Sequence, residues 1–241
     1  MSEQQPTSES NAARAVAEGD FIHINYTGKI AETGEIFDTT DQAIAKAHDI
    51  GGDGHKHYGP ASICVGKGQL LPGIDEQIIG KKKGKYTFSI KDVDAFGKKD
   101  GKLLKLVPVS IFKKQKINPR VGMDVDIDGN YGVVRTVTGG RVVVDFNHPL
   151  ASKDLTYDVE VVDFIDKPEE QVKVFLDMIH LHNATIAVTG DEATITIPFG
   201  LPAPFAEQLQ GQVASATSIK KLTFVNSAPK KDSTDEKKEA A

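Results

Sequence analysis

The pattern of apolar and polar positions divides the chain into short segments typical of strands and helices. In the segment FIHINYTGKI, Ile22, Ile24 and Tyr26 alternate with other residues, which predicts a strand with one face formed by these three side chains. The next segment, AETGEIFDTT, supplies a glycine turn and a second short strand that contains Asp38. Together the two segments predict a β-hairpin.

The segment 63–80, ICVGKGQLLPGIDEQIIG, predicts a strand, a glycine turn and then a short helix. Pro72 suits the first helical position, where its missing N–H group is not needed. Leu71, Ile74 and Ile78 follow helical spacing and share one apolar face. Because the first N–H groups of a helix have no partner within it, an apolar floor here would lie beside a free donor.

Between residues 107 and 148 the sequence is rich in alternating Val and is interrupted by glycine-containing turns. Asp128-Gly129 and Gly139-Gly140 are typical of hairpin turns, so this region predicts a small all-β module. The segment LTYDVEVVDFID follows and predicts a strong strand. One face of that strand would carry Leu155, Tyr157, Val159 and Val161.

Pro168 marks a boundary, because PEEQVKVFLDMIHLH begins with proline and two acidic residues and has helical apolar spacing. Two short strands flanking Gly190-Asp191, a helix around 204–210 and a last strand through SIKKLTFV complete an α-β-β-α-β unit. Residues 1–17 and 228–241 are rich in charged and small polar residues, and both are expected to be disordered tails.

Composition and charge narrow the classes of function. The chain has 241 residues, with 29 Lys and Arg against 34 Asp and Glu and a net charge of -5, which argues against a nucleic-acid partner. A single cysteine, Cys64, fits a reducing compartment. No apolar run approaches the roughly 18 residues of a membrane span, and the N-terminus does not resemble a signal peptide. We therefore expect a cytoplasmic protein with no membrane or nucleic-acid partner.

The sequence contains only incomplete versions of common cofactor-binding motifs. Gly66-Lys67-Gly68 lacks the third glycine of a dinucleotide-binding turn, and the same segment lacks the Lys-Ser/Thr pair of a P-loop. Cys64 lies inside an apolar strand, which favours a buried small side chain over a nucleophile. We therefore expect no cofactor.

A loop with three histidines leaves one question open. His48, His55 and His57 include a His-x-His pair that can chelate a metal. A solvated loop is the favoured interpretation, because no cysteine or third fixed ligand is evident nearby, and the predicted sites therefore include no metal.

Five short motifs occur in a fixed order: INYTGKI, GEIFDTT, VGKGQLLPGID, DAFG and LTYDVEVV. In this order and spacing they resemble the FK506-binding-protein (FKBP) family of peptidyl-prolyl isomerases, over residues 20–166. VGMDVDIDG and RVVVDFNHPLA, ahead of LTYDVEVV, resemble the insert-in-flap arrangement of SlyD-like and archaeal FKBPs. The unit after Pro168 resembles the long archaeal type.

The resemblance implies an α+β fold: an antiparallel FKBP sheet with a short helix, a small β-domain inserted in the flap, and a small C-terminal α+β domain. The expected division is an isomerase domain at 18–106 and 149–166, the insert at 107–148 and the C-terminal domain at 168–227.

The same resemblance implies an isomerase pocket. It would be formed by Tyr26, Phe37, Asp38, Leu70, Leu71, Ile74, Phe96 and Tyr157. In this assignment the Leu71 N–H holds a substrate carbonyl, and Asp38 orients the pocket or meets the twisting amide. Ile74 stands where drug-binding members usually have Trp, which puts tight macrolide binding in doubt more than isomerase activity.

The implied function is acceleration of X-Pro isomerisation in unfolded or partly folded polypeptides, with chaperone activity supplied by the insert. The alternative is a non-catalytic holdase or assembly module whose pocket is vestigial. In either case the C-terminal domain is a candidate for a homodimer contact.

Overall fold

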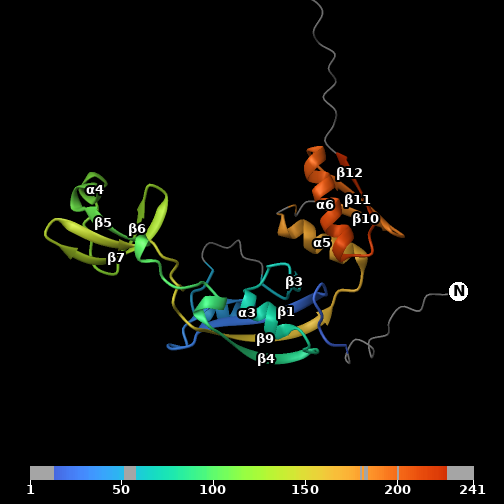
Figure 1. Ribbon diagram of the computed structural model, residues 1–241, viewed down its shortest axis with the longest axis horizontal. Helices are drawn as coiled ribbons and strands as arrows, with labels where there is room; N and C mark the ends of the chain where they lie inside the picture. Colours follow the sequence, from blue (N-terminus) through green and yellow to red (C-terminus); the bar gives the residue numbers. More distant parts are fainter. Residues whose placement is uncertain (1–13, 52–57, 180, 182–183, 200, 227–241) are drawn as a thin grey trace, which may run out of the picture.

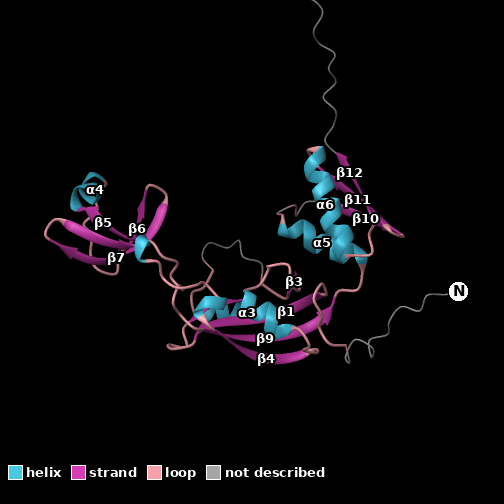
Figure 2. Ribbon diagram, in the orientation of Figure 1, coloured by secondary structure: helices cyan, strands magenta, loops and turns pink. Residues whose placement is uncertain are grey.

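The computed structural model describes residues 14–51, 58–179, 181, 184–199 and 201–226. Within these residues the chain forms three β-sheets (Figures 1 and 2). A central sheet is built from the first four strands together with β9, and two smaller sheets lie to either side of it in Figure 1. Each sheet has an apolar cluster of its own.

The central sheet has five strands in the order β2-β1-β9-β4, with β3 also paired to β1. All of its pairings are antiparallel. The strands are β1 (Phe21–Ile30), β2 (Ile36–Thr39), β3 (Ala61–Cys64), β4 (Gly84–Ile90) and β9 (Leu155–Phe164). The predicted hairpin is confirmed as β1 and β2.

One face of this sheet carries the core, as the alternation predicts. Leu155, Tyr157, Val159 and Val161 of β9 are all buried. The helix α3 (Pro72–Ile78) begins at the predicted proline and contributes Ile74 and Ile78 to the same cluster. The shorter elements of this part are α2 (Gln42–Ala47), η1 (Asp92–Asp94) and η2 (Gly101–Leu103).

The insert forms a four-stranded antiparallel sheet in the order β5-β8-β7-β6. Its strands are β5 (Leu104–Pro108), β6 (Asp124–Ile127), β7 (Asn130–Thr138) and β8 (Arg141–Asp145). Both predicted hairpin turns are confirmed, and all four of their residues have positive φ, from 53° to 81°. This conformation is the one that two-residue hairpin turns of the I′ type require.

The expectation that the insert is all-β is wrong for one segment. Residues after Pro108 form the helix α4 (Val109–Lys114). Phe112 is fully buried in the insert core, and Val109 and Ile111 pack against that core. A helix of six residues contains too few apolar positions for their spacing to distinguish a helix from a strand. The insert's sheet also begins earlier than the expected 107, at Leu104.

The C-terminal unit has the predicted α-β-β-α-β order. Its elements are α5 (Pro168–Met178), β10 (Thr185–Thr189), β11 (Glu192–Ile197), α6 (Ala203–Ala216) and β12 (Lys221–Asn226). Its apolar cluster includes Phe21 and Cys64 of the central sheet. The rings of Phe21 and Phe175 meet edge to face at 5.4 Å, so this unit packs directly on the central one. Among the described helices, none is long and apolar enough to cross a bilayer.

The chain enters and leaves the insert side by side. The Phe146 N–H donates to the Leu103 carbonyl at 3.0 Å. Asp100 and Asn147 face each other across the same two segments: the Asp100 N–H donates to Asn147 Oδ1 at 2.8 Å, and Asn147 Nδ2 donates to the Asp100 carbonyl at 3.1 Å. These bonds fix the two connecting segments to one another.

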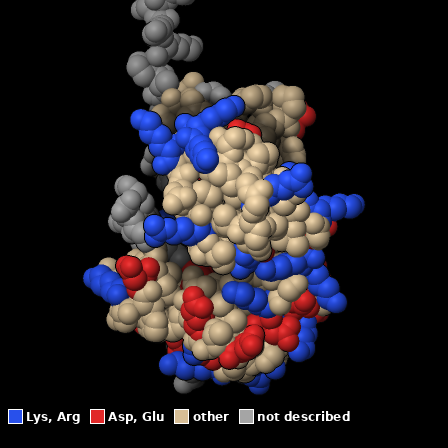
Figure 3. Space-filling view, turned by 90° about the vertical axis from the view of Figure 1, so that its left-hand side faces the viewer, with Lys and Arg blue, Asp and Glu red and all other residues tan. Residues whose placement is uncertain are grey.

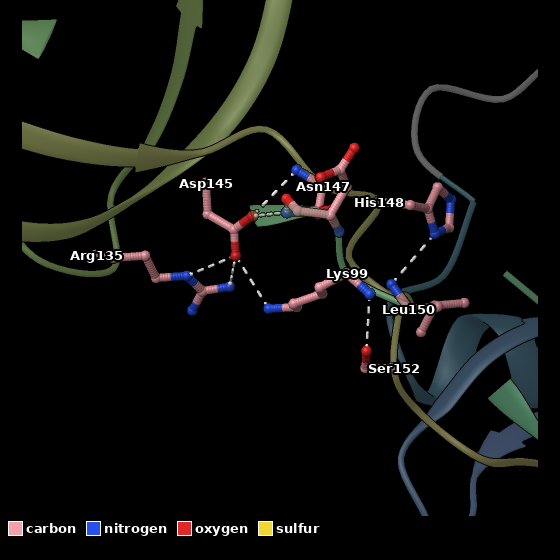
Figure 4. Close-up of polar contacts among 8 residues, drawn as sticks. Lys99, Arg135, Asp145, Asn147, His148, Leu150 and Ser152 are labelled. Carbon is pink, nitrogen blue, oxygen red and sulfur yellow. Dashed lines mark hydrogen bonds and ion pairs between the residues drawn. The ribbon is translucent and has the colours of Figure 1, made fainter. Parts of the chain in front are cut away.

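Asp145 is the centre of this junction (Figure 4). Its side chain is only 3% exposed and receives Lys99 Nζ at 3.0 Å and Arg135 Nε at 3.1 Å. Asn147 donates both its backbone N–H and its side-chain amide to the other carboxylate oxygen. Burial by itself would raise the pKa of Asp145, but these donors outweigh it and hold the pKa well below the ordinary value of 3.8.

We predict that Asp145→Asn loosens the insert by about 1–3 kcal/mol at neutral pH, because it removes the charge that Lys99 and Arg135 share. Since the folded-state pKa of Asp145 is depressed, its contribution is complete above 3.8 and is lost as the pH falls below that value. Hydrogen exchange of the β8 amides measures the opening free energy. Asp128→Asn, an exposed position in the same insert, should change little. An unchanged exchange rate in Asp145→Asn would contradict this role.

Candidate active site

A cavity of about 280 Å³ opens on the face of the central sheet that α3 covers. Its lining residues are Ile24, Tyr26, Asp38, Gly68, Gln69, Leu70, Leu71, Ile74, Phe96, Tyr157 and Val159. The structure therefore brings together every predicted pocket residue except Phe37. Phe37 is not among the lining residues, but its ring packs edge to face against Tyr157 with a centroid distance of 5.7 Å.

The aromatic wall follows from the pairing of β1 with β9. Tyr26 lies opposite Val159, and Gly28 lies opposite Tyr157, in the antiparallel register. The rings of Tyr26 and Tyr157 consequently meet at 6.1 Å, tilted by 52°. Two tyrosines from strands far apart in sequence thus form one surface, which is partly closed to solvent.

Gly28 allows this packing. A Cβ atom at this position would lie 2.7 Å from Cζ of Phe37 and 2.9 Å from Cε1 of Tyr157. Those distances are too short for any real side chain, so both rings depend on the missing Cβ to lie across the strand. The sequence shows Gly28 inside a strand pattern, which is a known signal of close approach, but it does not show what approaches.

Asp38 is held at the edge of the cavity by two donors. The Tyr26 hydroxyl donates to Asp38 Oδ2 at 3.0 Å, and the Thr39 N–H donates to Asp38 Oδ1 at 2.9 Å. Burial, and then the nearby Asp38 charge, raise the pKa of both Tyr26 and Tyr157. Both phenols therefore stay protonated at neutral pH, and Tyr26 remains a donor to the carboxylate.

The loop before α3 is held by two side chains that the sequence did not single out. The Asp75 carboxylate of α3 accepts the Gly66 N–H at 3.2 Å. Gln69 Oε1 accepts the N–H of Cys64. These contacts place Leu71 as the residue that caps α3, and no described residue accepts a hydrogen bond from the Leu71 N–H.

Phe96 carries a further aromatic neighbour that sequence reasoning missed. The His148 ring stacks on Phe96 with a centroid distance of 4.2 Å and an interplanar angle of 5°. The Leu150 N–H donates to His148 Nδ1 at 3.2 Å, which fixes the ring (Figure 4). The position of His148 at the end of the expected insert was the available signal, because that segment returns to the central sheet beside Phe96.

Two other candidate groups lie apart from this cavity. Cys64 is buried as predicted, and burial raises the pKa of its thiol to about 11. His48 ends α2, whereas His55 and His57 lie outside the described residues. Among the residues that the structure describes, no three His, Cys, Asp or Glu side chains gather as metal ligands would.

A larger hollow of about 770 Å³ lies on the opposite face of the central sheet. Besides Tyr26, Tyr86 and Val159, the strand residues that line it are polar or charged: Asn25, Thr27, Lys85, Thr87, Asp158 and Glu160. They alternate with the residues of the apolar face, such as Tyr157 and Val159. We take the smaller cavity as the candidate active site, because the aromatic side chains, Asp38 and the start of α3 converge only there.

Residues 105–150 match the family model described as FKBP26, IF domain. A "Short-type peptidyl-prolyl cis-trans isomerase" of Methanocaldococcus jannaschii is 30% identical over 149 residues, which cover 61% of this chain and 93% of the relative.

Two bacterial proteins are also similar. A "Probable FKBP-type 16 kDa peptidyl-prolyl cis-trans isomerase" of Pseudomonas fluorescens is 35% identical over 52% of this chain and 79% of its own length. The "FKBP-type peptidyl-prolyl cis-trans isomerase SlyD" of Vibrio cholerae is 32% identical over 47% of this chain and 58% of its own length. The order of motifs, the fold and these relatives together show that the chain belongs to the FKBP-type peptidyl-prolyl cis-trans isomerase family.

Proposed function

We propose that this protein catalyses cis-trans isomerisation of X-Pro bonds in unfolded polypeptides, and that its insert acts as the chaperone part that holds them. The main support for this proposal is the composition of the cavity, which brings an aromatic wall, the Asp38 carboxylate and the start of α3 together in one small space. The names of the similar proteins, all peptidyl-prolyl isomerases, support the same reaction.

The barrier to rotation explains why such a cavity suffices. Resonance stiffens the amide and sets a barrier of about 18–20 kcal/mol. The same resonance makes the planar amide more polar than the twisted one, so a dry, apolar cavity favours the twisted state. A thousandfold acceleration needs only about 4 kcal/mol of such differential stabilisation. This reaction forms and breaks no covalent bond, so the site requires no nucleophile.

The individual residues have distinct roles in this proposal. Tyr26, Tyr157 and Ile74 provide the apolar surface on which the proline ring lies, and the Phe37 ring supports Tyr157 through its edge-to-face contact. The Leu71 N–H binds the carbonyl of the substrate. Asp38, oriented by Tyr26, faces the amide as it twists.

The insert offers a separate surface for the polypeptide. A groove of about 460 Å³ lies between β5 and the tip of the β6-β7 hairpin, and we call it the insert groove. Leu106 is 54% exposed and Tyr131 is 80% exposed, although both are large and apolar. Since β5 is also an edge strand of its sheet, an extended chain can pair with it while its side chains enter the groove.

The same exposed surface favours the second candidate function, a holdase whose cavity is vestigial. A holdase needs the insert groove and no turnover at the cavity. A cytoplasmic location and a homodimer through the C-terminal unit also stay predictions.

Turnover of a short proline peptide separates the two functions. We expect Asp38→Ala to lower kcat/KM by about tenfold or more, which is about 1.4 kcal/mol of transition-state stabilisation. The loss follows from removing the group that faces the amide and the partner of the Tyr26 hydroxyl. Glu32→Ala, at an exposed hairpin turn, is the control and should keep full activity. Equal turnover in both variants would contradict the role of Asp38, and no turnover in the wild type would favour the holdase.

Gly28→Ala tests the aromatic wall without touching a polar group. The added methyl group would overlap Phe37 and Tyr157, so we expect both rings to shift and kcat/KM to fall by about tenfold, with a loss of about 1–3 kcal/mol in stability. Gly101→Ala adds the same methyl group where no atom lies within 4 Å, and it serves as the matched control. Activity retained in Gly28→Ala would show that the wall tolerates this displacement.

The insert groove is tested by refolding of a protein whose folding is limited by proline isomerisation. The double variant with Leu106→Ser and Tyr131→Ser should lose most of the catalysis of refolding, since it removes the apolar surface that holds the chain. Turnover of a short peptide should persist, because the cavity is unchanged. Val121→Ser, which alters an exposed apolar residue of the insert outside the groove, should retain both activities. Undiminished refolding in the double variant would exclude the groove as the recruiting surface.

A further inference from the structure

The insert differs in charge from the rest of the chain. Residues 105–150 contain seven Lys and Arg against four Asp, a net charge of +3, whereas the whole chain carries -5. The remainder therefore carries -8. A basic unit thus lies beside an acidic body.

The acidic side chains of the insert are not spread evenly over it. Asp145 is buried and already paired with Lys99 and Arg135. Asp124 and Asp126 belong to β6, and neither lines the insert groove, although Asp126 accepts the Gly129 N–H of the adjacent hairpin turn at 2.8 Å. Only Asp128 is acidic among the residues that line the insert groove.

The basic side chains lie close to the groove on its β5 and α4 side. Lys105 lines the groove, and its ammonium lies 5.7 Å from the centre of the Phe146 ring. Ile111 of α4 also lines it, and Lys114 follows at i+3, so the two side chains are neighbours on the helix surface. Lys105 and Lys114 are both exposed.

The view onto this end of the molecule agrees with that arrangement. Figure 3 shows a broad uncharged surface with Lys and Arg side chains along its border. Asp and Glu gather lower in the view, at the level where Figure 1 places the central sheet. A polypeptide that approaches this face therefore meets uncharged surface with positive charge around it.

We propose that the insert groove selects unfolded segments in which apolar residues are flanked by Asp or Glu. This inference rests on the proposed function of the insert. Positive charge at the border attracts an acidic segment, and the negative charge of the remaining chain repels it. Both effects direct such a segment to the groove, whereas a basic segment is drawn to the acidic body and repelled from the groove border.

Two labelled, unstructured peptides test the proposal with the full-length protein. Both have the same apolar centre without proline, and one is flanked by Glu and the other by Lys. By fluorescence anisotropy, we expect the Glu-flanked peptide to bind about tenfold more tightly at about 0.02 M salt. The difference should shrink as the salt concentration rises, because exposed charges are screened.

Charge reversal at the groove identifies the residues responsible. The double variant with Lys105→Glu and Lys114→Glu should abolish or reverse the preference. The matched control carries Lys46→Glu and Lys173→Glu, which change the net charge equally at exposed positions of α2 and α5. We expect this control to keep the preference of the wild type, and circular dichroism verifies the fold of both variants.

Each outcome bears on a separate conclusion. Equal affinity for the two peptides, or tighter binding of the Lys-flanked one, overturns the charge preference and leaves the insert as a chaperone surface. Failure to bind either peptide overturns the role of the insert in client binding as well. A preference lost equally in both double variants shows that net charge alone is responsible, which also overturns the assignment to the groove. Isomerase activity toward short peptides is independent of all three results.

Discussion

The pairing of β1 with β9 is the contact on which the rest of the structure depends. It joins the first strand of the central sheet to a strand more than a hundred residues later, from Ile22 opposite Phe164 to Ile30 opposite Leu155. Closing a loop of that length costs conformational entropy. Burial of apolar side chains along the whole face of the paired strands has to offset this cost. The same register places Tyr26 beside Tyr157. It also places Gly28 against the rings of Phe37 and Tyr157. The candidate active site is therefore a direct consequence of the closure that makes the fold.

The chain between β1 and β9 leaves the central sheet to form the insert, and it must return without changing the register of the two strands. The register is kept because the two segments that connect the insert lie side by side. Hydrogen bonds of Asp100, Asn147 and Asp145 join these segments. The returning segment then carries His148 onto Phe96, at the edge of the cavity. The junction of the insert and the edge of the active site are consequently parts of one segment. The insert groove is therefore attached to the body that contains the cavity by this short, hydrogen-bonded connection.

Much of this arrangement was predictable from residue patterns, and the exceptions share a physical cause. Alternation in β1 and β9, the glycine-containing turns of the insert hairpins and Pro72 at the start of α3 are local signals, and each was confirmed. The helix α4 was missed because its stabilising contact is the burial of Phe112, which only the folded insert reveals. Gln69 and Asp75 were missed because their partners are backbone N–H groups, which carry no residue identity in the sequence. The order of the motifs identified the pocket residues, but the contacts that support them depend on how the whole chain folds.

The C-terminal unit is connected to the candidate active site through β1, whose first residues contact two different apolar clusters. Ile22 and Ile24 of β1 point into the core beneath the cavity, whereas Phe21 belongs to the apolar cluster of the C-terminal unit. Cys64 belongs to that second cluster too, and its N–H is the donor that holds Gln69 in the loop before α3. The loop that carries Leu71 is thus anchored at a residue whose side chain packs on another unit. A continuous chain of packed and hydrogen-bonded residues therefore joins the C-terminal unit to the loop that carries Leu71.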